Sequence, residues 1–233
     1  MSASFDLVME NCERFGAAIR RLGGTSPPLR VGAPATEGEI VEVEMRLGRK
    51  IPSALRSILV SHARSFSFQW ERDHFHMLPH PWKHACEGRC LWSLDLLPLL
   101  NADLEAWREN VFPDAADRYQ QHWHGVFAAC ATGLSDGSSA STDFDGGDFF
   151  AIKEHATDGQ PVVFLSHDGF TPLNGRRLAD DFDDFLLRWS AIGCVGGASG
   201  WGLEYFITDS RGGLDPAGEA AAKFRGFLGV ELA

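Results

Sequence analysis

The stretch from Gly147 to Trp189 constrains the fold more than any other part of the sequence. Two β-rich runs, Phe149–Ile152 and Val162–Leu165, flank a polar loop that contains Gly159, a pattern that predicts a β-hairpin with a longer connection. An amphipathic helix is expected next, because its apolar residues recur at intervals of three and four: Leu178, Phe182, Phe185, Leu186 and Trp189. This apolar face must be buried, and the adjacent hairpin is its nearest partner.

The remaining apolar patterns predict further helices and strands around this unit. Helical spacing extends over Phe5–Leu22, a capping box of Thr36 and Glu39 begins a second helix, and Pro52 starts a third. Strands are expected at Phe66–Trp70, Phe75–Leu78 and Val126–Cys130, and helices after an N-cap at Asn101, at Pro113–His122 and near Pro216–Leu228. The strands do not alternate with helices, so we expect an α+β fold with a single antiparallel β-sheet and helices packed around it.

The N-terminal region predicts a division of the chain at residue 35. The segment Thr25–Ala35 holds three prolines and several small residues, a composition that is typical of a linker. We therefore expect an N-terminal helix and linker over residues 1–35, followed by one α+β domain over residues 36–233.

Charge and cysteine content narrow the classes of partner and compartment. The formal net charge of -11 and the absence of a basic cluster in the sequence argue against nucleic-acid binding. The charge permits a basic protein partner, although solubility is its simpler cause. No run approaches the roughly 18 apolar residues of a membrane span, and no signal-peptide pattern occurs near the start. Five scattered cysteines favour a reducing compartment over a disulfide framework. We expect a cytoplasmic protein.

A cluster of histidines and cysteines is the most metal-like feature of the sequence. Imidazole and thiolate are preferred ligands of zinc, and six such residues lie in one short stretch: His74, His76, His80, His84, Cys86 and Cys90. Their spacings match no ordinary zinc finger or knuckle, and the stretch has no Cys-x2-Cys pair. Surface or loop histidines are therefore favoured, and we expect no metal or other cofactor.

Acidic residues concentrate in the Ser/Gly/Asp-rich segment before the predicted hairpin. They are Asp136, Asp143, Asp145 and Asp148. If Asp143 is taken as position 1 of an EF-hand loop, position 6 must be glycine, but this sequence has Asp148 there. The flanks of an EF-hand loop are also helices, whereas strands are expected here. A solvated loop is the simpler interpretation, and its functional alternative is contact with a basic protein partner.

The sequence contains the residue types of a catalytic triad and an unusual number of tryptophans. Ser166, His167 and Asp168 are the residue types of a catalytic triad, but consecutive residues of a strand point to opposite faces and cannot assemble one. No G-x-S-x-G, Walker-type or dinucleotide-binding motif occurs, so the sequence predicts no enzyme. Among the seven tryptophans, Trp82 and Trp123 are the candidates for exposed binding residues, but partial burial under a loop is the more common state of such side chains.

Three blocks of residues, in this order, carry a resemblance to a known family. The first is the capped helix with Leu47-Gly48 and Ile51-Pro52; the second is Gly147-Asp148, Pro161–Leu165 and His167-Asp168; the third is the helix pattern Leu178–Trp189. Together they resemble the SUKH superfamily, which includes the yeast cell-wall-synthesis regulators of the Smi/Knr type. The resemblance extends over roughly residues 36–230 and implies an α+β fold with one antiparallel sheet.

The resemblance also implies a function without catalysis. Many bacterial members are immunity proteins that bind and neutralise a cognate toxin, so we expect a protein-binding module that occludes a toxin, with a basic toxin domain as the expected partner. A regulatory or scaffold protein that binds a host protein is the alternative. A zinc-dependent hydrolase that uses the His74–Cys90 cluster is a third hypothesis. The sequence does not predict the oligomeric state.

Overall fold

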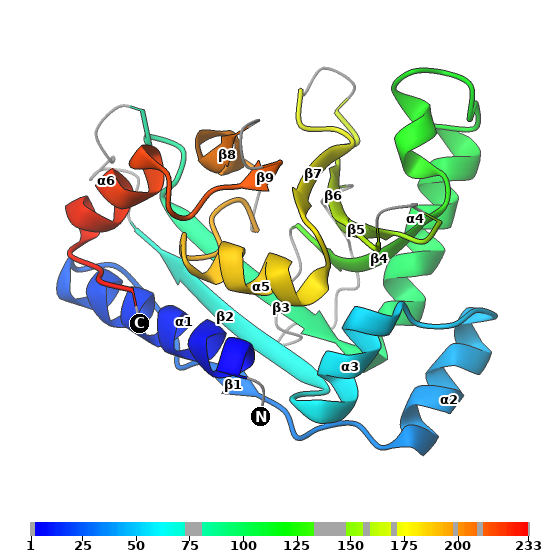
Figure 1. Ribbon diagram of the computed structural model, residues 1–233, viewed down its shortest axis with the longest axis horizontal. Helices are drawn as coiled ribbons and strands as arrows, with labels where there is room; N and C mark the ends of the chain where they lie inside the picture. The colour runs from blue at the N-terminus through cyan, green and yellow to red at the C-terminus, as the bar shows by residue number, and fades with distance from the viewer. Residues whose placement is uncertain are drawn as a thin grey trace.

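A computed structural model describes residues 3–72, 81–132, 148–155, 159–168, 172–197, 200–208 and 212–232 (Figure 1). Its helices are α1 (Ala3–Arg21), α2 (Glu37–Leu47), α3 (Ser53–Ser61), α4 (Leu97–Asn110), α5 (Phe182–Ser190) and α6 (Glu219–Leu228). Its longer strands are β2 (Ser65–Glu71), β3 (Glu87–Ser93), β4 (Val126–Ala131), β5 (Phe149–Lys153), β6 (Val162–Leu165) and β7 (Arg176–Ala179). Three two-residue strands complete the set: β1 (Arg30–Val31), β8 (Ile207–Thr208) and β9 (Gly213–Leu214).

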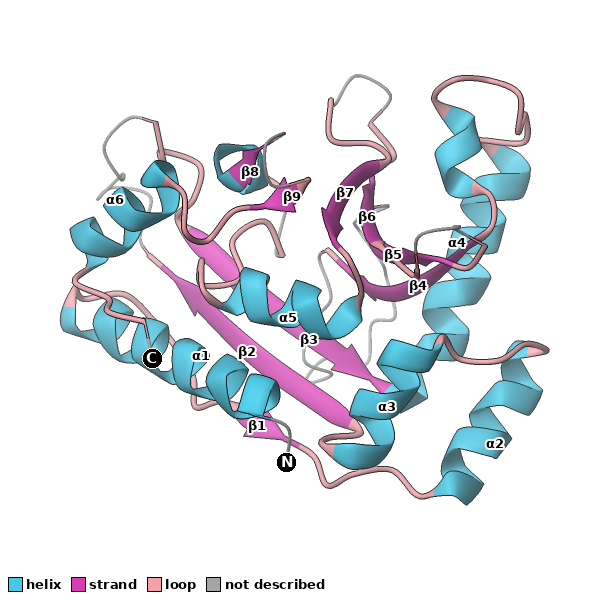
Figure 2. Ribbon diagram, viewed as in Figure 1, coloured by secondary structure: helices cyan, strands magenta, loops and turns pink. Residues whose placement is uncertain are grey.

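The α+β class is confirmed, but the expectation of a single sheet is wrong. The described strands form three antiparallel sheets, in the orders β1-β2-β3, β4-β5-β6-β7 and β8-β9 (Figure 2). The edge of β3 is occupied by the segment after α5, since Arg89 N–H donates to Cys194 O at 3.0 Å and Gly88 bridges to Val195. Local patterns predict which segments are strands, whereas the pairing of their edges depends on contacts between distant segments.

The predicted hairpin and helix form the centre of the structure. β5 and β6 pair in antiparallel register, with Phe149 opposite Leu165 and Ile152 opposite Val162. The helix begins later than predicted, because Leu178 lies in β7 and the Asp181 side chain caps α5 by accepting from Asp184 N–H at 2.9 Å. The apolar spacing of three and four therefore extends beyond the helix itself, because its first member lies in a strand and the N-cap separates that strand from α5.

The four-stranded sheet is covered on both faces. Alternate residues of β5 and β6 belong to different apolar clusters: Phe150 and Phe164 face the cluster that contains α5, and Phe149 and Leu165 face the cluster that contains α4. This alternation is the two-residue period of a strand. Because both faces are buried, β5 and β6 are almost entirely apolar.

Helix α1 packs against α5 and the three-stranded sheet. Its Phe5 ring lies 6.0 Å from the ring of Phe66 on β2, and Asn11 Nδ2 donates to Ser190 Oγ of α5 at 3.3 Å. The predicted linker contains β1, which pairs with β2. The N-terminal segment thus shares an apolar cluster with the later helices, while the division at residue 35 stays a prediction.

Two local predictions are wrong for physical reasons that the structure makes clear. Asn101 lies inside α4 rather than at its N-terminus, and its side chain bonds to the backbone of β4. Pro113–His122 is not a helix; turns lead to a 3-10 turn at Gln120–Trp123. Asp114 and Asp117 accept bonds from nearby backbone N–H groups, which compete with helical hydrogen bonds. The predicted strand Phe75–Leu78 lies outside the described residues.

The predicted capping box of α2 is confirmed, and the same helix carries a buried carboxylate. Glu44 is 6% exposed and accepts from Lys50 Nζ at 2.6 Å and from Ile51 N–H at 3.2 Å. Burial raises the pKa of Glu44, but these hydrogen bonds and the charges of Lys50 and Arg56 outweigh it and lower the pKa.

We expect Glu44→Gln to destabilise the protein at neutral pH but not in acid. A carboxyl group with a lowered pKa in the folded state contributes stability above its unfolded pKa, and this contribution is lost as the pH falls through the folded pKa. Urea unfolding from about pH 7 down to about pH 2 measures the difference. Glu42→Gln, on the exposed face of the same helix, is the control. A difference between wild type and Glu44→Gln that does not change with pH would contradict this account.

Candidate functional site

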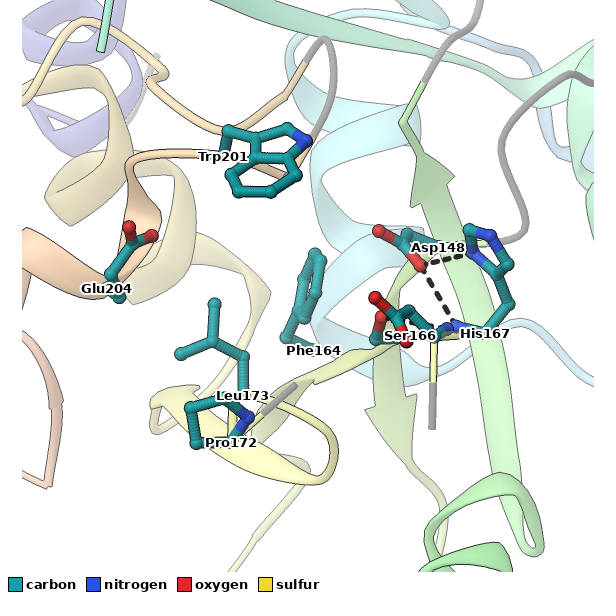
Figure 3. Close-up of a pocket in the computed structure, with 10 residues that line it drawn as sticks. Asp148, Phe164, Ser166, His167, Pro172, Leu173, Trp201 and Glu204 are labelled. Carbon is teal, nitrogen blue, oxygen red and sulfur yellow. Dashed lines mark hydrogen bonds and ion pairs between the residues drawn. The ribbon is translucent and has the colours of Figure 1, made fainter. Parts of the chain in front are cut away.

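A pocket of about 680 Å³ opens beside the ends of β5 and β6 (Figure 3). Its polar lining comes from Asp148 directly before β5, from Ser166, His167 and Asp168 directly after β6, and from Glu204. The antiparallel register explains part of this arrangement, since Phe149 opposite Leu165 places the residues next to them at the same end of the hairpin. The pocket volume lies within the range of small-molecule binding sites.

Apolar side chains form the rest of the pocket lining. Phe164 and Leu173 are buried, whereas Trp201 is 62% exposed. Trp201 follows Gly200 in the segment before α6, and its ring lies 5.5 Å from that of His84. The pocket therefore combines a buried apolar floor, an exposed indole and several carboxylates (Figure 3).

Asp148 and His167 form the best-defined polar pair of the site. Asp148 Oδ1 accepts from the His167 backbone N–H at 3.0 Å and lies 2.8 Å from His167 Nδ1. Because a carboxylate accepts hydrogen bonds, this contact suits the imidazole tautomer that carries a proton on Nδ1. Asp148 is 8% exposed, and the Asp148 carbonyl accepts from Thr132 N–H at 3.0 Å. The pair holds the turn after β6 against the start of β5.

Tyr119 holds the segment after β6 through hydrogen bonds to its backbone. Its hydroxyl lies 2.9 Å from the carbonyl oxygen of Asp168 and contacts that of Ser166, while the Asn174 side chain bridges Tyr119 O and Ser166 N–H. Burial raises the pKa of Tyr119 to about 12, and the negative charges of Asp148 and Asp168 add to this effect. The phenol thus responds to the negative potential of the pocket.

This raised pKa is directly measurable. The chain has two tyrosines, so a Tyr205→Phe variant retains Tyr119 alone, and we expect it to ionise near the raised value of about 12. Because the folded state holds the phenolic proton more tightly, the stability that it contributes is complete below the ordinary pKa of about 10 and is lost as the pH rises through the folded value. Ultraviolet absorbance of tyrosinate reports the titration, and far-UV circular dichroism reports folding. Half-ionisation near pH 10 in a folded protein would contradict the prediction.

The three adjacent triad-like residues do not form a triad in the described hydrogen bonds. His167 bonds to Asp148, and Ser166 Oγ accepts from Asp168 N–H at 3.3 Å instead of bonding to the imidazole. Adjacent positions at the end of a strand separate the side chains, as the sequence predicts.

Trp82 and Trp123, the two candidates for exposed binding residues, are both buried. Trp82 is 7% exposed and packs near Phe224 of α6; Trp123 is 1% exposed and stacks on Phe112 with ring centroids 4.4 Å apart. Flanking polar residues in the sequence suggested exposure, but tertiary contacts cover both rings. The exposed tryptophan at the pocket is Trp201, which the sequence analysis did not select; its position in a Gly-rich loop was the available signal.

The structure describes three of the six residues that were candidates for metal ligands. His74, His76 and His80 lie outside the described residues. His84 is exposed, Cys86 is half-buried and Cys90 is buried in the core. Across the part of the chain that the structure describes, no group of three or more His, Cys, Asp or Glu side chains is placed to hold a metal ion.

Of the four acidic candidates, only Asp148 is described; Asp136, Asp143 and Asp145 lie outside the described residues. Asp148 is buried in the pocket wall rather than exposed on a loop surface. Contact of the other three with a partner therefore stays a prediction. Among the described helices, none is both long and apolar enough to cross a membrane.

The structure combines an α+β fold with a pocket at one end of the four-stranded sheet. The chain belongs to the SMI1 / KNR4 family (SUKH-1), whose family model matches residues 34–188. This range includes Asp148 and His167, and it confirms the resemblance found in the sequence; Trp201 and Glu204 lie beyond it. No curated protein and no solved structure matches the chain in the corresponding searches.

Proposed function

We propose that this protein is a cytoplasmic, non-enzymatic binding module that acts as an immunity protein of the antitoxin type. Membership of the SUKH-1 family is the observation that carries the proposal, because many bacterial relatives neutralise toxins by binding them. The net charge of -11 and the carboxylates of the pocket support a basic partner.

The proposed mechanism is occlusion of the toxin's own site. An acidic surface steers a basic partner during encounter, and the contact then excludes substrate from the toxin. The proposed contact region combines the pocket with the acidic segment that precedes Asp148 in the sequence and contains Asp136, Asp143 and Asp145. Association should slow as salt concentration rises, because mobile ions screen charges beyond about 10 Å.

Co-expression with the product of the adjacent gene tests this proposal. We expect a stable complex and loss of the toxic activity that the neighbouring product shows when expressed alone. A toxic neighbour that neither binds this chain nor is silenced by it would overturn the immunity proposal. A complex with a non-toxic host protein would instead support a regulatory or scaffold role and would likewise exclude immunity.

A further inference from the structure

One carboxylate oxygen of the buried Asp148 side chain lines the pocket without a hydrogen-bond donor among the described residues. Asp148 Oδ1 is engaged by His167, whereas within the described residues no hydrogen bond reaches Oδ2. The second carboxylate oxygen of Asp148 points into the pocket toward the side that carries Trp201 (Figure 3). The Asp148 side chain is largely removed from water, so a carboxylate oxygen without a hydrogen-bond donor there favours a cationic ligand.

Gly200 keeps this oxygen accessible. A Cβ atom at position 200 would lie 2.9 Å from Asp148 Oδ2 and 3.2 Å from the Phe164 ring, and the residue has a φ of +75°. Any side chain there would cover the acidic oxygen and narrow the pocket, and the left-handed backbone disfavours other residues as well. The glycine thus leaves room for a group that approaches both Asp148 and Phe164.

The opposite wall suits the flat, apolar part of such a group. Trp201 exposes 62% of its surface, which is unusual for the largest apolar side chain, and Phe164 and Leu173 supply a buried floor. Glu204 and Asp168 add negative charge at the exposed part of the lining. The indole face and the carboxylates together match a planar cation on an aliphatic stem.

We infer that the pocket receives one arginine side chain of the protein partner, with its guanidinium at Asp148 Oδ2 and its plane against Trp201. A guanidinium matches this site better than an ammonium because it is planar, weakly hydrated and able to stack while it donates to a carboxylate. The methylene stem packs on Phe164 and Leu173. This inference rests on the proposed function, since it specifies how a protein partner is anchored.

The first test uses a peptide probe in place of the partner. N-acetyl-Gly-Arg-Gly-amide is titrated into ¹⁵N-labelled protein, and the indole N–H signal of Trp201, assigned with Trp201→Phe, is followed by NMR. We expect saturable shifts with a dissociation constant on the order of millimolar, the range for a single anchoring side chain. A control peptide in which citrulline replaces arginine should give no saturable shift, because citrulline has nearly the same shape as arginine but no charge. Equal responses to both peptides, or none to either, would overturn the inference.

Three variants locate the binding determinants. Asp148→Asn keeps an oxygen acceptor for His167 but removes the charge, and Trp201→Ala removes the stacking surface; each should weaken arginine-peptide binding at least about tenfold. Phe227→Ala is the matched control, because Phe227 is an exposed aromatic residue of α6 that does not line the pocket. The ¹⁵N spectrum shows whether each variant is folded. Folded Asp148→Asn and Trp201→Ala variants that bind like wild type would contradict the assignment.

The full-length partner separates this inference from the proposed function. If a toxin complex forms, Trp201→Ala should weaken it about 30-fold or more, as expected for a central anchor, and Phe227→Ala should not. A complex that tolerates Trp201→Ala overturns the anchor while the immunity function stands. Saturable arginine-peptide binding without any toxin complex supports the pocket assignment while the immunity function fails.

Discussion

Replacement of Trp189 by alanine is expected to lower the free energy of unfolding by about 3–5 kcal/mol. Trp189 is 1% exposed, and its ring centroid lies 4.5 Å from that of Phe150 on β5 and 4.8 Å from that of Phe185 on α5. Its Nε1 donates to Val195 O at 2.8 Å, in the segment that pairs with β3. One side chain therefore connects α5, the four-stranded sheet and the edge of the three-stranded sheet.

Chemical denaturation monitored by far-UV circular dichroism measures this effect. Trp201→Ala is the matched control, because its indole is 62% exposed, and surface changes of this kind usually alter stability by about 0.5 kcal/mol or less. A second variant, Trp189→Phe, retains a ring but removes the hydrogen bond to Val195, and it should show an intermediate loss. A Trp189→Ala variant as stable as Trp201→Ala would show that the contacts of Trp189 with Phe150, Phe185 and Val195 contribute little to stability.

Asn101→Ala is expected to destabilise the protein by about 2–4 kcal/mol, because it leaves buried backbone groups without partners. Asn101 Oδ1 accepts from Ala128 N–H at 3.0 Å, and Asn101 Nδ2 donates to Ala128 O at 3.0 Å. β4 is an edge strand of its sheet, so the amide supplies the bonds that a further strand would make. Arg49 also donates to Asn101 Oδ1, and its guanidinium carbon lies 4.8 Å from the centre of the Phe127 ring.

The matched control for this change is on the same helix. Asn110 is exposed, and its Nδ2 donates to Ala106 O at 2.8 Å. Asn110→Ala therefore removes one hydrogen bond that water can replace. We expect a loss of no more than about 0.5 kcal/mol. Urea unfolding of both variants gives the comparison. Equal stabilities would indicate that water replaces the Asn101 amide at β4.

Several interactions between residues close in sequence were predicted correctly. Thr36 and Glu39 form the expected capping box, and Gly48 ends α2 in a left-handed conformation. The runs Phe149–Ile152 and Val162–Leu165 pair as the expected hairpin. The alternation in Phe66–Trp70 also gives the expected strand with one buried and one partly exposed face. In each case the deciding forces act over a few residues: a cap bond, a permitted φ angle or the two-residue period of a strand.

The candidate site was only partly accessible from the sequence. Asp148 was selected for its charge, and His167 was recognised as part of a family motif, but their mutual hydrogen bonds follow from strand register. Trp201 was missed because its position at the pocket depends on the segment after α5 crossing toward β6. Trp82 and Trp123 have polar neighbours in the chain, yet residues distant in sequence cover them.

The sequence by itself determined the α+β class, the family and most local elements, because these depend on periodicity, capping and turn chemistry within short windows. Only the tertiary structure decided that the strands divide into three sheets and that Asn101 bonds to a strand edge. It also decided that the pocket joins Asp148, His167 and Trp201. These features arise where distant segments compete for the same edges and faces, and the outcome of that competition depends on the packing of the whole chain.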